Sequence, residues 1–150
     1  MTTEKLEIRN ERLFAVDQGT LFNAFADPSK LALWWGPHGF TNRIDAFDFR
    51  LGGDWRITMT ASNGTDFANR WTFQEIEAPR RILALHHEPM HVFTLEMAFE
   101  ENEEGTRLAW CMLFEPTDEN RELEKFIRAA NEQNLDRLEQ MLNTGAKSDG

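Results

Sequence analysis

Three histidines lie close together in the sequence, at positions 86, 87 and 91, and they are the first side chains to consider for chemistry. Imidazole is a common metal ligand. Adjacent residues on a strand point to opposite faces, however, so His86 and His87 are not expected to share one metal ion. No carboxylate or thiolate completes a known ligand spacing. We therefore expect no metal and no cofactor, and we expect one of His86 and His87 to face the interior as an acid–base or hydrogen-bonding group.

Other catalytic groups are not apparent. Cys111 is the only cysteine, it alternates to the outer side of its strand, and no histidine or basic residue adjoins it in the sequence. A lowered thiol pKa, which a cysteine nucleophile needs, is therefore not expected. The sequence has no Ser/His/Asp arrangement, glycine-rich phosphate loop or carboxylate pair that indicates a mechanism. Catalytic residues stay unassigned, and whether the protein is an enzyme stays open.

Bulky apolar side chains recur at every second position of several segments, which is typical of strands with one buried face. Large flat or flexible side chains can line a pocket without filling it. The alternative is that they interdigitate as an ordinary core. The inward-facing set comprises Trp55, Ile57, Met59, Trp71, Phe73, Met97, Trp110 and Met112.

The C-terminal segment has helical spacing, with Leu123, Phe126, Ile127, Ala130, Leu138 and Met141 along one stripe. Asn131 and Asn134 interrupt that stripe. A buried amide needs a partner, which a ligand or a water molecule would supply; the alternative places both at the helix margin in solvent. Trp34-Trp35 before Gly36-Pro37 either gates a cavity or locks short helices onto the sheet. The expected ligand-binding set is the strand residues above together with Trp35, His86, Phe126, Ala130 and Asn134.

The elements that must position these residues follow in a simple order. The patterns predict a strand over 6–16, two short helices over about 17–26 and 28–35, six further strands, and a helix of roughly 25 residues from Thr117 or Asp118 to Leu142. The six strands are expected at 40–50, 54–60, 67–76, 81–86, 92–100 and 106–114. Consecutive strands with separate helices indicate an α+β domain. We expect one domain over 1–145 and a disordered tail over 146–150.

Composition excludes several classes of partner. The chain of 150 residues carries a net charge of −10 with its basic residues scattered, which argues against nucleic acid and against an anionic membrane surface. No apolar run approaches the roughly 20 residues of a membrane span, so no membrane insertion is expected. The first residues lack the pattern of a signal peptide, so a cytoplasmic protein is expected. A homodimer stays open, because homodimers are common.

Six segments, in order along the chain, carry a family resemblance: Phe25-Ala26-Asp27-Pro28, Trp34-Trp35-Gly36-Pro37, Phe49 to Arg56, Glu75 to Ile82, Gly105-Thr106-Arg107-Leu108 and Asn134 to Leu138. Together they resemble the START-like (SRPBCC, helix-grip, Bet v 1-like) superfamily. The likeness is closest to its single-domain bacterial branch, the homologues of the activator of the heat-shock chaperone ATPase. Two features depart from that branch: Gln18-Gly19 and Phe22 stand where it often has Pro and Trp, and the chain has no tyrosine.

The resemblance implies a helix-grip fold, in which a curved antiparallel sheet of about seven strands holds a long C-terminal helix, with two short helices after the first strand. It also implies a cavity between sheet and helix. The leading expectation is binding or carriage of a small apolar molecule there. One alternative is an enzyme of the polyketide cyclase or dehydratase kind, in which a histidine and an asparagine position the substrate. A second is an interaction module that acts on a chaperone.

Overall fold

A single antiparallel sheet of seven strands forms the body of the protein. The computed structural model describes residues 5–89 and 91–148. The strand order is β1-β7-β6-β5-β4-β3-β2, and every neighbouring pair is antiparallel. The strands are β1 (Leu6–Phe14), β2 (Thr41–Phe47), β3 (Asp54–Thr60), β4 (Asp66–Glu77), β5 (Arg81–Glu88), β6 (Phe93–Asn102) and β7 (Gly105–Phe114). The expected α+β class and helix-grip architecture are confirmed.

Three helices complete the fold: α1 (Gln18–Ala26), α2 (Pro28–Trp34) and α3 (Asp118–Ser148). Each begins where a side chain accepts a hydrogen bond from an unpaired backbone N–H group of the first turn. Asp17 accepts from Thr20 at 2.7 Å, and Asp27 accepts from Ser29 at 3.0 Å. At α3 the capping residue is Thr117, whose hydroxyl accepts from the backbone of Asn120 at 3.1 Å.

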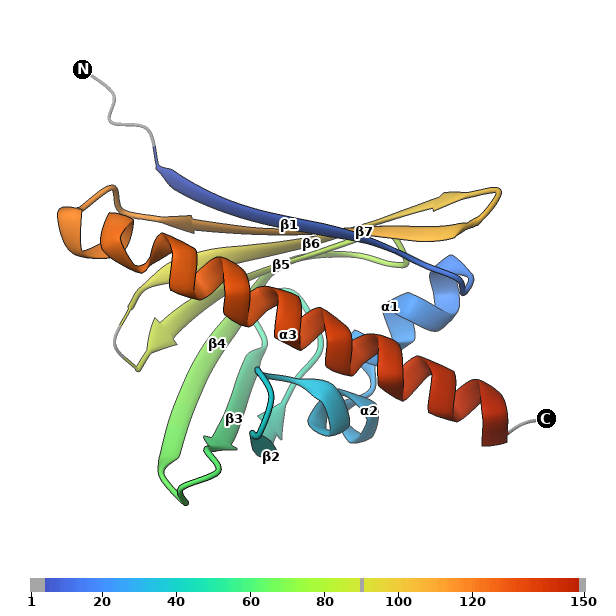
Figure 1. The fold of residues 1–150 in the computed structure, drawn as a ribbon, viewed down its shortest axis with the longest axis horizontal. Helices are drawn as coiled ribbons and strands as arrows, with labels where there is room; N and C mark the ends of the chain where they lie inside the picture. The colour runs from blue at the N-terminus through green and yellow to red at the C-terminus, as the bar shows by residue number, and fades with distance from the viewer. Residues whose placement is uncertain (1–4, 90, 149–150) are drawn as a thin grey trace.

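The sheet curls strongly, and α3 runs across its concave side (Figure 1). The strands β1, β6 and β7 lie along one side of α3, whereas β2, β3 and β4 descend on the other. The short helices cover part of the same face. Phe22 and Phe25 of α1 pack edge-to-face against Phe99 of β6, with ring centroids 5.4 and 5.1 Å apart. The long helix therefore does not cover the sheet alone: α1 and α2 fill one part of the concave face, and α3 spans the rest.

The long helix extends further than its apolar stripe indicated. The expected end was Leu142, with Gly145 as a stop signal, whereas α3 continues to Ser148. A glycine within a helix costs only about 1 kcal/mol relative to alanine, so it does not end a helix by itself. Residues 149–150 lie outside the described residues, and the disordered tail over 146–150 stays a prediction. None of the described helices is long and apolar enough to cross a membrane.

Candidate functional site

A cavity of about 410 Å³ lies between the N-terminal half of α3 and the concave face of the sheet. Its walls come from the α2–β2 loop, from strands β3 to β7, from the β5–β6 connection and from α3. Phe126 of α3 belongs to this lining and is 72% exposed, so it lies at the opening to solvent. Ligand pockets in proteins typically measure about 300–1,000 Å³ and are mostly apolar. This cavity falls within that range.

Most of the side chains expected at a binding site line this cavity. They come from four strands, one loop and the long helix, so only the folded sheet brings them together. They are Trp35, Met59, Trp71, His86, Trp110, Met112, Phe126, Ala130 and Asn134.

Four expected residues lie outside the cavity, in the packed part of the core. Trp55, Phe73 and Met97 surround only about 10 Å³ of space with Phe25 of α1 and Leu31 of α2. Ile57 is fully buried in the same core. All four lie on the concave face of the sheet, as expected, but α1 and α2 cover the part of that face where they lie. Trp35 separates the two regions: it lines the cavity, and its ring centroid is 5.0 Å from that of Trp55.

Other cavity residues were not expected from the sequence. Phe93, Leu95 and Phe114 continue the inward faces of β6 and β7, so the same alternation that identified Met97 and Met112 could have found them. Ile127 and Asn131 also line the cavity; the sequence placed both on the C-terminal helix stripe, but neither was in the expected binding set. His91 was considered only as a metal ligand. The remaining ones gave no local signal, because they lie near strand ends or in loops, and they include Phe40, Phe67 and Asn69.

His86 is the interior histidine of the pair, with 4% of its surface exposed, and it lines the cavity. Its Nδ1 lies 2.7 Å from the carbonyl oxygen of His91, and its Nε2 lies 2.8 Å from Oδ1 of Asn69. Burial lowers the pKa of His86 to about 4, against the smaller opposing effect of the His91 carbonyl. The Asn69 amide nitrogen donates to the carbonyl oxygen of Phe67 at 3.0 Å, which turns Oδ1 of Asn69 toward the ring. Both ring nitrogens of His86 therefore face oxygen atoms. His87 points the other way and pairs with Thr72.

Both candidate asparagines of α3 are buried, with 7% of Asn131 and 5% of Asn134 exposed. The Asn134 amide nitrogen donates to the carbonyl oxygen of Trp34 at 3.1 Å. The Asn131 nitrogen donates to Oδ1 of Asn10 at 3.0 Å. The Asn10 orientation is itself fixed, because its nitrogen donates to the carbonyl oxygen of Arg128 and to the carboxylate of Glu132. The expectation of a solvent-exposed helix margin is therefore wrong, and the direct partners of both nitrogens are protein groups.

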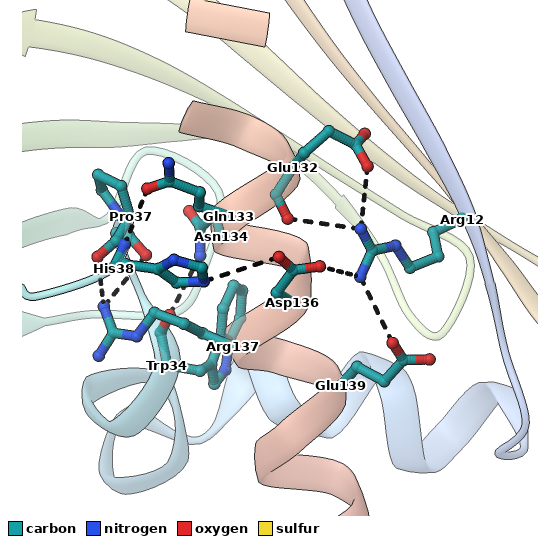
Figure 2. Close-up of polar contacts among 11 residues, drawn as sticks. Arg12, Trp34, Pro37, His38, Glu132, Gln133, Asn134, Asp136, Arg137 and Glu139 are labelled. Carbon is teal, nitrogen blue, oxygen red and sulfur yellow. Dashed lines mark hydrogen bonds and ion pairs between the residues drawn. The ribbon is translucent and has the colours of Figure 1, made fainter. Parts of the chain in front are cut away.

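The loop that forms one cavity wall is held to α3 by polar side chains (Figure 2). Arg137 donates from Nη1 to the carbonyl oxygens of Trp35, Gly36 and Pro37 at 2.8, 3.1 and 3.1 Å. The backbone N–H of His38 donates to Gln133 at 3.2 Å. Gly36 has φ +93°, and a Cβ there would approach Met59 Cε to 2.7 Å, so this tight loop needs glycine at that position.

On its other side, α3 is attached to the edge strand β1 through Arg12 (Figure 2). The guanidinium lies 2.9 Å from carboxylate oxygens of both Glu132 and Asp136. Burial alone would lower the pKa of Arg12, but the hydrogen bonds with these carboxylates raise it overall. Polar contacts thus hold α3 in place on both sides of the cavity. Apolar side chains are not needed beneath the helix to keep it at that position.

Chemically reactive arrangements are sparse around the cavity. Among the residues that the structure describes, no group of three or more His, Cys, Asp or Glu side chains could hold a metal ion. Cys111 is half buried on β7, and burial together with the nearby Glu7 raises its pKa to about 11. Its thiol is therefore protonated at neutral pH. Both ring nitrogens of His86 are already within hydrogen-bond distance of protein atoms. The geometry suits binding of an apolar group better than acid–base chemistry.

Comparison with known proteins gives one family and many structures of the same fold. Residues 15–143 match the family model described as Activator of Hsp90 ATPase homolog 1-like protein. A solution structure of a protein from Arthrobacter aurescens superposes with a TM-score of 0.85 at 22% identity, covering 93% of this chain and 87% of the other. A crystal structure from Nitrosomonas europaea gives 0.82 at 21% identity, covering 93% and 96%. The AHSA1 protein from Silicibacter pomeroyi gives 0.79 at 24% identity, covering 93% and 99%. No curated protein matches the sequence.

Proposed function

The chain belongs to the family of Activator of Hsp90 ATPase homolog 1-like proteins, and from this premise we propose that it binds and carries a small apolar molecule in the cavity beneath α3. The observation that carries the proposal is the cavity itself, about 410 Å³ of space lined mainly by aromatic and aliphatic side chains. Packed interiors rarely contain voids much larger than a water molecule. A space of this size under a helix that polar contacts hold in place is a feature of binding proteins.

Binding without reaction is the better supported form of this proposal. A substrate acting through acid–base chemistry would need a group within hydrogen-bond reach that can exchange a proton. His86 is the titratable side chain buried at the cavity, and its two nitrogens already contact His91 and Asn69. A polyketide cyclase-like activity would require one of those contacts to break. We therefore place catalysis second to carriage.

Mass spectrometry of the purified protein under native and denaturing conditions tests the proposal directly. A carried molecule is expected to add mass in the native spectrum and to be released on denaturation. Added ligand should also raise the thermal midpoint, because a ligand that binds only the folded state stabilises it by RT ln(1 + [L]/Kd), or about 2.7 kcal/mol at a hundredfold excess over Kd.

Filling the cavity from α3 separates an open site from a packed core. Ala130 lines the cavity, whereas its neighbour Ala129 is exposed on the outer side of the helix. Extra methylene groups in a well-packed core cost about 1–3 kcal/mol. Ala130→Leu is instead expected to change the free energy of unfolding little and to abolish ligand binding, while Ala129→Leu should preserve both.

The same pair of variants gives the outcome that would refute the proposal. If Ala130→Leu lowers the free energy of unfolding by several kcal/mol and a broad panel of apolar compounds never shifts the thermal midpoint of the original protein, the cavity is not a binding site.

A further inference from the structure

The polar atoms at the cavity wall restrict which apolar molecule can bind. Asn131 and Asn134 are three residues apart on α3 and therefore share one helix face. Both line the cavity, and both are more than nine-tenths buried. Their nitrogens are occupied by Asn10 and by the carbonyl oxygen of Trp34.

The orientation of these two amides follows from their partners. A backbone carbonyl oxygen only accepts, so Asn134 must present its nitrogen to Trp34. Asn10 uses its nitrogen on Arg128 and Glu132, so its oxygen faces Asn131, which must also present nitrogen. The two Oδ1 atoms accept no hydrogen bond from any residue that the structure describes. Among the described residues, the fully enclosed side-chain atoms without a partner are Asn42 Oδ1 and the indole nitrogens of Trp55, Trp71 and Trp110. The two Oδ1 atoms of Asn131 and Asn134 are not among them, so they keep contact with open space. Because both residues line the cavity, their oxygens are acceptors available to an occupant.

The lack of charged side chains in the cavity wall is the second feature that restricts which ligand can bind. Among the described residues that line the cavity there is no aspartate, glutamate, lysine or arginine. A carboxylate ligand would meet two carbonyl oxygens and no fixed cation. An ammonium ligand would find acceptors and aromatic faces, but no carboxylate to balance its charge. Taking an unpaired charge out of water is expensive, so both kinds of ion are disfavoured relative to a neutral molecule.

We propose that the cavity is specific for an uncharged apolar molecule carrying a hydroxyl or N–H group, which donates to Oδ1 of Asn131 and Asn134. This inference rests on the proposed function and narrows it, since it excludes fatty acids and other carboxylates as preferred ligands. The apolar body of the molecule would lie against Trp35, Trp71 and Trp110, which line the same space.

Four probes with one ring system test the inference by isothermal titration calorimetry: 2-naphthalenemethanol, 2-methylnaphthalene, 2-naphthoate and 2-naphthylmethylammonium. The titrations are done at pH 8. The alcohol is expected to bind roughly fivefold more tightly than the hydrocarbon, the effect of about one hydrogen bond. The carboxylate and the ammonium are expected to bind more than about tenfold more weakly than the alcohol.

Variants assign the preference to the helix. Asn131→Leu and Asn134→Leu should each reduce the ratio of alcohol to hydrocarbon affinity toward one. Asn42→Leu is the matched control, because Asn42 also donates to backbone carbonyl oxygens of Ala32 and Trp35 yet lies outside the cavity lining. It is expected to lower stability without altering that ratio. The four-probe comparison on the original protein needs no variant to fold.

The outcomes separate the two proposals. If the carboxylate or the ammonium binds as tightly as the alcohol, or the hydrocarbon does, the specificity inference is wrong while the binding function stands. If none of the four probes binds and no apolar compound of the wider panel shifts the thermal midpoint, the proposed function fails and the inference fails with it.

Discussion

At the scale of single residues, the hydrogen-bond partners of His86 and its burial shift the pKa of its ring in opposite directions. Its nitrogens face oxygen atoms of His91 and Asn69, an arrangement that suits a doubly protonated ring. Its burial against the rings of Trp71 and Phe93, with centroids 4.7 and 4.6 Å away, disfavours the charged form. Burial is the larger effect, and the pKa of His86 falls to about 4. The buried imidazole is therefore a neutral structural group at physiological pH.

This pKa predicts how stability depends on pH. In the unfolded chain the ring has a pKa near 6.5, so between about pH 6.5 and 4 the unfolded state binds more protons than the folded state. Stability contributed by His86 is complete above pH 6.5 and is lost as the pH falls toward 4. Urea unfolding at pH 7 and pH 5 should show a loss about 1–2 kcal/mol larger in the original protein than in His86→Phe.

An NMR titration provides the direct measurement for the same prediction. The ring resonances of His86 should titrate with a midpoint near 4, well below the ordinary histidine value of about 6.5. A midpoint at or above 6.5 would mean that the two oxygen neighbours outweigh burial, and that the ring carries a charge into the cavity wall.

At the scale of elements, the α2–β2 loop is a part of the cavity wall that belongs to no helix or strand. Arg137 supplies the connection, since one of its nitrogens reaches three consecutive carbonyl oxygens. Burial lowers the pKa of Arg137, but an arginine side chain stays charged in proteins. Hydrogen bonds to a charged group contribute more than neutral ones. The wall is thus attached to α3 by side chains, with Arg137 making most of the hydrogen bonds and Gln133 accepting one from His38.

Removing that attachment should affect stability and binding together. Arg137→Met keeps most of the aliphatic stem but removes the charged donor that these three carbonyl oxygens share, while the Trp35 oxygen keeps its hydrogen bond from Asn42. It is expected to lower the free energy of unfolding by about 1.5–3 kcal/mol and to weaken binding of 2-naphthalenemethanol. Arg121→Met, at an exposed position of the same helix, is the control and should change neither. A change below about 0.5 kcal/mol in Arg137→Met would show that the loop holds its position without this contact.

At the scale of the whole molecule, family membership and activity have to be kept apart. The family description refers to activators of the Hsp90 ATPase. The solved structures of the same fold are less than 25% identical to this chain and establish the fold alone. A fold carries many functions, and function depends on the site. The feature that this chain presents as a site is its cavity.

We therefore expect that the isolated protein does not stimulate the ATPase of an Hsp90-type chaperone. A partner shifts a conformational equilibrium only through different affinities for its states, and an apolar cavity beneath a fixed helix does not provide such a surface. The measurement is a steady-state ATPase assay across a range of protein concentrations. A saturable stimulation would place the interaction module ahead of ligand carriage.

Much of this architecture follows from local patterns in the sequence. Alternation gave the inward faces of β3, β6 and β7, and helical spacing gave α3. Asn63-Gly64, between β3 and β4, is a dipeptide typical of a hairpin turn. The positive φ of +88° at Gly64 shows why glycine marks that turn. Such signals work because they depend on a few neighbouring residues, and most of the side chains that they placed at a binding site line the cavity.

What the sequence could not decide is which part of an apolar face is packed and which is hollow. Trp55 and Trp71 are paired neighbours on β3 and β4 and look alike in the sequence, yet only Trp71 lines the cavity. The difference comes from α1 and α2, whose side chains fill the space beside Trp55. The partners of Asn131 and Asn134 likewise come from β1 and α2, about 120 and 100 residues away along the chain. Alternation reports the direction of a side chain, whereas the element opposite it is set by the tertiary fold alone.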